Sequence, residues 1–255
     1  MIIMFKKKDQ PYDFVALNSL DYALKRVSGP TVPWALNIDF SEANQLALIG
    51  HGAPGQIAGV DAKDIAARME HLKYGVPDTI DRLIITSCYA GVRVGGKCGS
   101  SVVEVLAGAL CSRKVKSVVI SGAKGPSVKA DALGDQFSVV DDTKPKQVQS
   151  SQLTQEVAAK IVKPIDLVNF PKDKSKFLTQ EGNATIIQGN YFEAHEIDTN
   201  NSSDQFRMQI AAAAAARGTK KFYQDFVADM KKNSLLLGGS NMLTIEINDG
   251  VSKIV

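Results

Sequence analysis

Two short apolar runs, each followed by small residues, constrain the fold of this chain more than any other feature. Residues 46–49 (Leu-Ala-Leu-Ile) run into Gly50, and residues 83–85 (Leu-Ile-Ile) run into Thr86 and Ser87. Short apolar runs bounded in this way are typical of strands buried on both faces, as in a parallel sheet. We therefore expect two neighbouring parallel strands in the first half of the chain.

The segment between these runs has a helical pattern. Asp61 is placed to cap a helix, and Ile65, Met69 and Leu72 follow at the spacing of one helical face. A strand, a helix and a strand in succession predict a parallel sheet covered by helices. We expect strands at residues 13–17, 34–38, 46–49, 82–87, 115–121 and 242–247. We expect one or two helical turns within 19–27 and helices at 61–74, from 102 after a cap at Ser100 or Ser101, and at 152–162. Residues 204–230 are expected to form one or two helices with an interruption at Gly218.

The reactive side chains of the chain follow the two buried strands. His51 comes after the first strand and Cys88 after the second, 37 positions later. The carboxyl ends of parallel strands open at one edge of the sheet, where ligands and catalytic groups gather. The spacing therefore predicts that an imidazole and a thiol meet there, as the base and nucleophile of covalent catalysis.

Composition limits the other classes of function. The 255 residues suit one large domain, and a net charge of +3 gives no argument for a nucleic-acid or membrane partner. Three cysteines do not form a disulfide framework and leave at least one thiol free. The first five residues are an apolar stub before Lys6, unlike a secretion signal, and no apolar run approaches the roughly 18 residues of a membrane span. We expect a soluble protein that is cytoplasmic or exported into a host cell without a signal peptide.

These motifs resemble those of the caspase-like cysteine peptidases, which include caspases, metacaspases, legumain, clostripain, gingipain and the self-processing protease domains of bacterial toxins. An apolar strand followed by His-Gly matches residues 46–52, and an apolar strand followed by Cys matches residues 83–91. The Gly-His-Gly form is most similar to the toxin-type and caspase-type members. The resemblance implies a three-layer α/β/α fold with a mainly parallel sheet. It places the catalytic core in residues 1–125, with residues 126–255 completing or extending the same domain.

The resemblance also implies roles for individual residues. Cys88 would be the nucleophile, His51 its proton partner, and Gly52 N–H a donor to the oxyanion. Asn18 and Asp39 are candidates for the residue that orients the histidine. Ser121, Gly122 and Lys124 are candidates for the substrate groove. The separation of His51 and Cys88 is short for the superfamily, and no arginine marks a caspase-type pocket for acidic residues.

The predicted function is that of a cysteine endopeptidase acting on a protein or peptide, with self-processing as a possibility and no cofactor. Two alternatives remain open at this point. One is an inactive caspase-like module used for binding or regulation. The other is a thiol-dependent acyl transferase or deamidase that uses the same two side chains. The sequence leaves the oligomeric state and the residue cleaved undetermined.

Two other motifs compete for the same residues. Gly50 to Gly55 satisfies the G-x-G-x-x-G pattern of dinucleotide-binding folds, with Glu70 at a suitable distance. However, the helical pattern begins near Asp61 and not at the glycines, which argues against a dinucleotide site. His51, His71, Cys88 and Cys98 do not follow the spacing of a tetrahedral metal site, so no metal is predicted.

Overall fold

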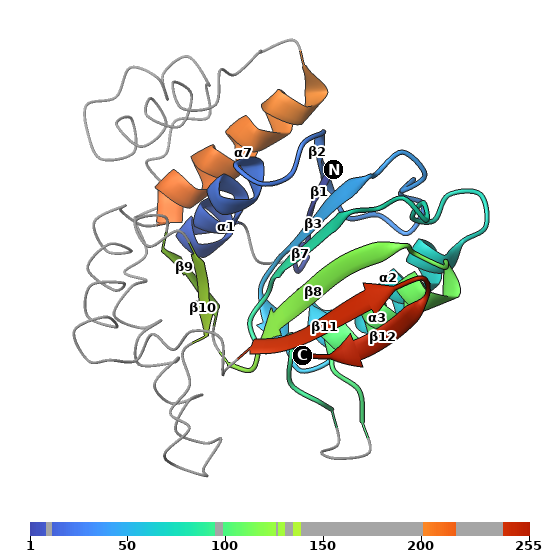
Figure 1. The fold of residues 1–255 in the computed structure, drawn as a ribbon. Coiled ribbons are helices and arrows are strands. Elements are labelled where there is room, and N and C mark those ends of the chain that lie inside the picture. Colours follow the sequence, from blue (N-terminus) through green and yellow to red (C-terminus); the bar gives the residue numbers. More distant parts are fainter. Residues whose placement is uncertain (9–11, 95–98, 126, 131–134, 139–200, 218–241) are drawn as a thin grey trace, which may run out of the picture.

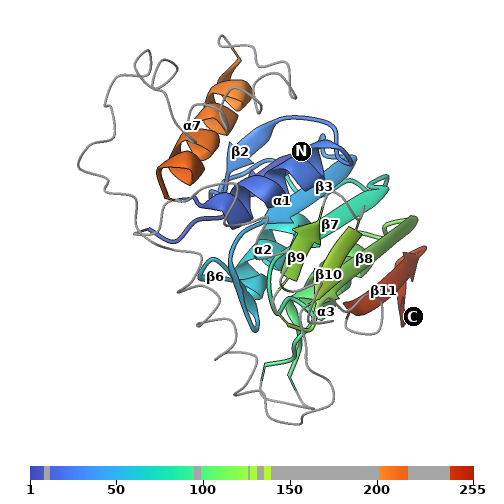
Figure 2. The same ribbon diagram turned by 90° about the vertical axis from the view of Figure 1, so that its left-hand side faces the viewer.

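The chain folds as a mixed α/β structure around a mainly parallel sheet, with helices on both faces (Figures 1 and 2). The structure is a computed structural model that describes residues 1–8, 12–94, 99–125, 127–130, 135–138, 201–217 and 242–255.

Four parallel strands form the central sheet in the order β2-β1-β3-β7. Their side chains are largely buried, and the two inner strands, β1 and β3, expose almost none of theirs. This burial explains why the strands read as continuous apolar runs and not as alternating patterns. The strands are β1 (Ile2–Met4), β2 (Thr31–Pro33), β3 (Gln45–Ile49) and β7 (Arg82–Thr86).

Antiparallel strands continue the fold beyond β7. Strand β8 (Ser117–Ala123) lies along β7 and pairs with β11 (Met242–Asn248), which pairs with β12 (Val251–Ile254) (Figure 1). Strands from before and after position 125 therefore pair in one sheet. The division into a catalytic core of residues 1–125 and an extension of residues 126–255 stays a prediction. The short strands are β4 (Gly52–Ala53), β5 (Gln56–Ile57), β6 (Val60–Asp61), β9 (Ser127–Ala130) and β10 (Asp135–Ser138).

Helices α2 (Ala62–Glu70) and α3 (Val102–Ser112) pack on one face of the sheet. The Asp61 side chain caps α2, and Ser101 and Glu104 form a reciprocal capping box at the start of α3. The buried side chains of both helices join those of β3, β7 and β8 in one apolar core, which contains Ile65, Met69, Val103, Leu106 and Leu110.

Helices α1 (Phe14–Leu24) and α7 (Ser202–Arg217) cover the other face and lie side by side (Figures 1 and 2). Leu17 and Leu20 of α1 and Ile210 of α7 are buried with side chains from β1 and β3. At the edge of the sheet, Thr31 N–H donates a hydrogen bond to Ser203 Oγ over 2.7 Å. The alanine-rich α7 is thus a close-packed structural helix, as its composition predicts.

Several predicted elements are wrong in type or extent. Residues 14–24 form one helix instead of a strand at 13–17, because the Asp13 cap and the packing of Leu17 and Leu20 favour helix. Residues 34–38 are turn and irregular backbone after the shorter β2. Helix α2 ends at Glu70, so Leu72 lies beyond it with 90% of its surface exposed. The apolar stub at the start of the chain is the central strand β1.

The remaining predictions agree with the structure where it describes the chain. The strands at 46–49, 82–87, 115–121 and 242–247, the helix from Asp61 and the Ser101 cap are confirmed within one or two residues. The helix at 204–230 is confirmed as far as Arg217. The predicted helix at 152–162 lies outside the described residues. No helix in the described ranges is both long and apolar enough to cross a bilayer.

Candidate active site

The register of the parallel sheet brings His51 and Cys88 to the same level. Ile49 of β3 lies opposite Thr86 of β7, so each candidate residue stands two positions beyond a paired residue. Both side chains therefore emerge where the chain leaves the carboxyl ends of neighbouring strands, which we call the carboxyl edge of the sheet. This placement is the one that the two sequence motifs predict.

The backbones that follow the two strands are in direct contact. A Cβ atom built on Gly52 would lie 1.8 Å from the Cys88 carbonyl oxygen and 2.3 Å from Ser87 Oγ. No side chain fits at position 52, because the closer of these atoms belongs to rigid backbone. Gly52 thus lets the loop after His51 pack against the loop that begins at Cys88. That the Gly52 N–H donates a hydrogen bond to an oxyanion stays a prediction.

Asp13 is the acidic partner of His51. The Asp13 Oδ2 atom lies 2.9 Å from His51 Nε2, while Oδ1 accepts a 3.0 Å hydrogen bond from Ala16 N–H at the start of α1. One carboxylate therefore caps the helix and contacts the imidazole. The side chain of Asp13 is 24% exposed and that of His51 46% exposed, so the pair is open to a ligand on the histidine side.

The environment of Asp13 favours its charged form. Burial alone would raise the pKa of the carboxyl, but the hydrogen bond and charge of His51 and the N–H groups of Ala16 and Val15 outweigh it. The pKa of Asp13 is therefore lowered from its ordinary value. A carboxylate that stays charged at neutral pH can orient an imidazole and stabilise its protonated form.

The Cys88 thiol is free, half-buried and hydrogen-bonded. Ser127 N–H, at the start of β9, points to Cys88 Sγ over 3.2 Å. A main-chain N–H at a sulfur atom stabilises negative charge there, which is the state in which cysteine attacks a carbonyl. The short hairpin β9–β10 therefore supplies a contact to the Cys88 thiol that the sequence does not indicate.

Asn18 does not follow the end of a strand, as the predicted strand at residues 13–17 would require. Asn18 lies in the middle of helix α1, and the residue at the turn before this helix is Asp13. Asp39 lies in the turn before β3, at the opposite end of the sheet from His51, and its carboxylate accepts a 2.9 Å hydrogen bond from Ser41 N–H. The carboxylate that contacts His51 is that of Asp13, and an orienting role for Asn18 or Asp39 stays a prediction.

The end of β8 lies beside the loop that follows Cys88. Gly91 N–H donates to Ala123 O over 2.9 Å, and Tyr89 N–H donates to Gly125 O over 2.8 Å. A Cβ on Gly122 would lie 2.4 Å from a Val103 methyl group, so Gly122 serves close packing. Ser121 Oγ bonds to Thr244 Oγ1 on β11, and Lys124 is exposed. A substrate groove at these residues stays a prediction.

The competing motifs have other structural roles. The glycine-rich segment forms the β4–β5 hairpin, and the next helix begins at Ala62, so no helix opens at these glycines. His71 ends helix α2, and its Nδ1 atom lies 3.2 Å from the N–H groups of Lys73 and Tyr74. Within the described ranges, no three His, Cys, Asp or Glu side chains form a group suited to a metal ion.

Asp13 is the site residue that the sequence analysis missed, although a signal for it exists. Asp13 stands directly before a segment in which Leu17, Leu20 and Leu24 recur every three or four residues. An Asp in this position is typical of the cap of an amphipathic helix. A helix start after a parallel strand points toward the carboxyl edge of the sheet. Interpreted in this way, the pattern would have placed a carboxylate close to His51.

Comparison of this chain with models of protein families, with curated proteins and with solved structures finds no match.

Proposed function

We propose that this protein is a cysteine endopeptidase with a caspase-like fold, in which Cys88, His51 and Asp13 act together. The observation that carries the proposal is that these three residues, from three separate segments, all lie at the carboxyl edge of the sheet. The Asp13–His51 contact of 2.9 Å joins positions 38 residues apart, and the strand register sets Cys88 level with His51. A thiol, an imidazole and a carboxylate in this order form the constellation used for covalent acyl transfer.

The mechanism follows from the chemistry of these side chains. His51 takes the proton of the Cys88 thiol. The resulting thiolate attacks the scissile carbonyl carbon, and the carbonyl oxygen becomes an oxyanion next to Gly52 N–H. The tetrahedral intermediate collapses to a thioester on Cys88 as His51 gives a proton to the leaving amine. Water, deprotonated by His51, then attacks the thioester and releases the acid product. Asp13, whose carboxyl is ionised at neutral pH, holds the imidazole and balances its positive charge.

The arrangement of the elements is consistent with a caspase-like topology. A parallel sheet with helices on both faces carries histidine after one strand and cysteine after its neighbour. Asp13 comes before the histidine in the chain and caps the helix that follows β1. The imidazole is half-exposed and bonded to a carboxylate, and the thiol is half-buried and accepts a backbone hydrogen bond. These features favour an enzyme over a binding module, because a structural cysteine is usually buried and inert.

A peptide-library cleavage experiment tests this function. We expect the unmodified protein to cut a subset of peptides, with products identified by mass spectrometry, and Cys88→Ala to cut none. His71→Ala is a matched control, since His71 is exposed at the other end of the sheet. Cleavage that persists in Cys88→Ala would overturn the proposal. Transfer of the acyl group to an added amine, with little hydrolysis, would favour the transferase alternative.

Self-processing is tested on the same proteins. The intact chain and Cys88→Ala are incubated side by side and separated on a denaturing gel. Fragments that form only when Cys88 is present would show that the protein cuts itself.

A further inference from the structure

The residue directly after the nucleophile has an unusual backbone conformation. Tyr89 has φ of +57°, in the left-handed region that side-chain-bearing residues rarely adopt. The conformation costs roughly 1–2 kcal/mol for a residue other than glycine. Residues held in this way gather at functional sites, where the surrounding structure enforces them.

The left-handed residue turns the chain sharply away from β7. Tyr89 N–H is bonded to Gly125 O over 2.8 Å, and Val92 N–H returns to Tyr89 O over 3.0 Å. Val103 N–H, in the first turn of α3, donates to Ala90 O over 3.1 Å. The chain after Cys88 is therefore bonded on one side to the end of β8 and on the other to the start of α3.

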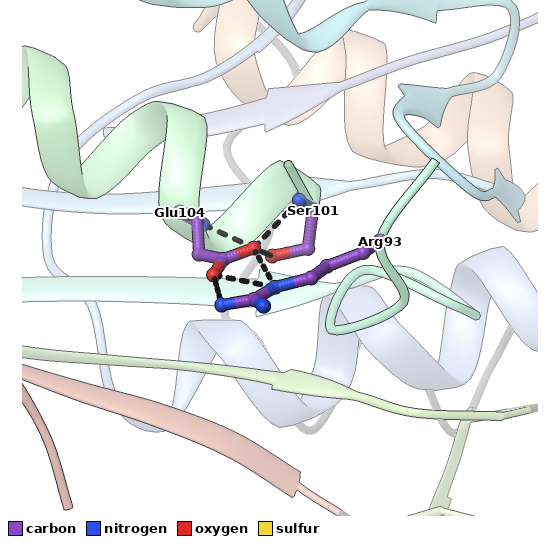
Figure 3. Close-up of polar contacts among 3 residues, drawn as sticks. All are labelled: Arg93, Ser101 and Glu104. Carbon is purple, nitrogen blue, oxygen red and sulfur yellow. Dashed lines mark hydrogen bonds and ion pairs between the residues drawn. The ribbon is translucent and has the colours of Figure 1, made fainter. Parts of the chain in front are cut away.

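An ion pair fixes the far end of this turn (Figure 3). Arg93 Nε donates to both carboxylate oxygens of Glu104 at 2.8 and 3.1 Å, and the Nη2 group also contacts Glu104. The same carboxylate accepts hydrogen bonds from Ser101 N–H and Oγ, each over 2.9 Å. Arg93 is thereby tied to the capping box of α3, so the turn is held at both ends.

The packing around the turn leaves no room for it to relax. A Cβ on Gly91 would lie 2.5 Å from Gly122 O, and Gly52 packs directly against the Cys88 carbonyl. Any change of φ at Tyr89 would therefore have to move Cys88 or break the bonds to Gly125 and Ala123.

We propose that Tyr89 is a positioning residue whose left-handed backbone holds the Cys88 thiol where His51 can act on it. The inference rests on the proposed function, because it concerns how that nucleophile is placed. It assigns the role to the backbone of Tyr89 and not to its phenol group. Glycine and asparagine, which adopt this conformation readily, would therefore serve in its place, whereas a β-branched residue would not.

Lys114 provides a matched control. It has φ of +55° directly after α3, at the end of that helix away from Cys88. Valine at position 114 therefore imposes a comparable backbone cost without touching the nucleophile turn. The variants are Tyr89→Val, Tyr89→Gly, Tyr89→Asn and Lys114→Val, each with His51 intact and with His51→Ala.

The readout is the factor by which His51→Ala slows alkylation of Cys88 by iodoacetamide at one neutral pH. Peptide mapping by mass spectrometry separates Cys88 from the other cysteines. We expect a factor of at least about tenfold in the unmodified protein, Tyr89→Gly, Tyr89→Asn and Lys114→Val. In Tyr89→Val we expect the factor to fall to about two or less, so that His51→Ala barely changes the alkylation rate. Far-ultraviolet circular dichroism shows that each variant is folded before it is measured.

Three outcomes overturn the inference. If Tyr89→Val keeps the His51 dependence, the left-handed turn does not place the thiol. If Tyr89→Gly loses the dependence, the phenol side chain and not the backbone carries the effect. If His51→Ala has no effect in the unmodified protein, the proposed function fails, and the inference fails with it. The first two outcomes leave the proposed function standing.

Discussion

The two edges of the central sheet use polar side chains in different ways. At the amino edge, where the strands begin, polar groups hold the loops that lead into the strands: Asp39 accepts a hydrogen bond from Ser41 N–H, and Thr79 Oγ1 donates to Asn44 Oδ1 over 3.1 Å. At the carboxyl edge, Asp13 contacts His51 and Ser127 contacts Cys88, and these partners lie 38 and 39 residues apart in the chain. Partners from separate segments occur at both edges, since Thr79 and Asn44 lie 35 residues apart. The carboxyl edge differs in the chemistry of its contacts, which involve a carboxylate, an imidazole and a thiol.

A strained backbone and an unsatisfied hydroxyl lie on either side of Cys88. Tyr89 adopts a left-handed conformation directly after Cys88, and Thr86 Oγ1, two residues before it, is buried without a hydrogen-bond partner in the part of the chain that the structure describes. Such local costs are retained where function requires them. Both features lie within two residues of Cys88, at the carboxyl edge of the sheet.

Removing the central pair is expected to have the largest effect. Cys88→Ala abolishes peptide cleavage, and His51→Ala lowers kcat/KM by at least about a thousandfold, because the nucleophile and its base act as one unit. His71→Ala, at the amino edge, leaves kcat/KM unchanged. Initial-rate measurements on a cleaved peptide provide the test. Equal losses in the two histidine variants would show that the edges do not differ in function.

Neutralising Asp13 is expected to have the next largest effect. Asp13→Asn keeps a good helix cap but removes the negative charge beside His51, so kcat falls by roughly a hundredfold or more while the stability changes little. Asp39→Asn is the control from the amino edge, where the same chemical change leaves kcat intact. Kinetics on the same peptide check both variants. An unaffected Asp13→Asn enzyme would remove this residue from the mechanism.

The pH dependence of stability separates the two carboxylates further. Since the pKa of Asp13 is lowered in the folded protein, the stability it contributes is present above its unfolded pKa of about 3.9. That stability is lost as the pH falls through the folded pKa, because the unfolded chain then binds the proton more readily. Urea unfolding between pH 5 and about pH 2.5 is expected to show a shallower loss in His51→Ala, which removes a cause of the shift.

Asp39 is the comparison in that experiment. Its pKa is also lowered, chiefly by the N–H and hydroxyl groups of Ser41, so its contribution to acid stability does not depend on His51. Asp39→Asn should therefore reduce the loss of unfolding free energy at acid pH by the same amount whether or not His51 is present. If the effects of Asp13→Asn and His51→Ala simply add, the two groups are not coupled.

The smallest expected effect concerns the buried hydroxyl of Thr86. Thr86→Val removes an oxygen that has no partner among the described residues, so the free energy of unfolding stays constant or rises by about 1 kcal/mol. Thr79→Val at the amino edge removes a hydroxyl that is bonded to Asn44, and it is expected to lower stability slightly. Urea denaturation measures both. A clear loss in Thr86→Val would show that this hydroxyl has an unrecognised role.

The sequence predicts the part of the fold that rests on local patterns. Strands β3 and β7 and helices α2 and α3 each carry an uninterrupted apolar run or a clear cap, so their position and the level of His51 and Cys88 follow from the residues alone. The five apolar residues before the lysine run are too few to identify β1, which becomes an inner strand of the sheet only by pairing with β2 and β3.

The missed half of the site depends on tertiary contacts. Residues 14–17 are apolar in succession and fit a strand as well as a helix, and burial against β1, β3 and α7 decides for the helix. That choice brings Asp13 to His51. The contact of Ser127 N–H with Cys88 cannot be predicted from residue types, because a backbone group carries no sequence signal. Tyr89 likewise gives no sign in the sequence of its left-handed backbone.

The most direct test of the account is the rate at which a peptidyl acyloxymethyl ketone labels Cys88. The account predicts rapid labelling of Cys88 in the unmodified protein, with the rate reduced at least about tenfold in Asp13→Asn and further in His51→Ala. Labelling of Cys88 at the same rate in all three proteins would contradict it, because the thiol would then react without help from the imidazole and carboxylate beside it.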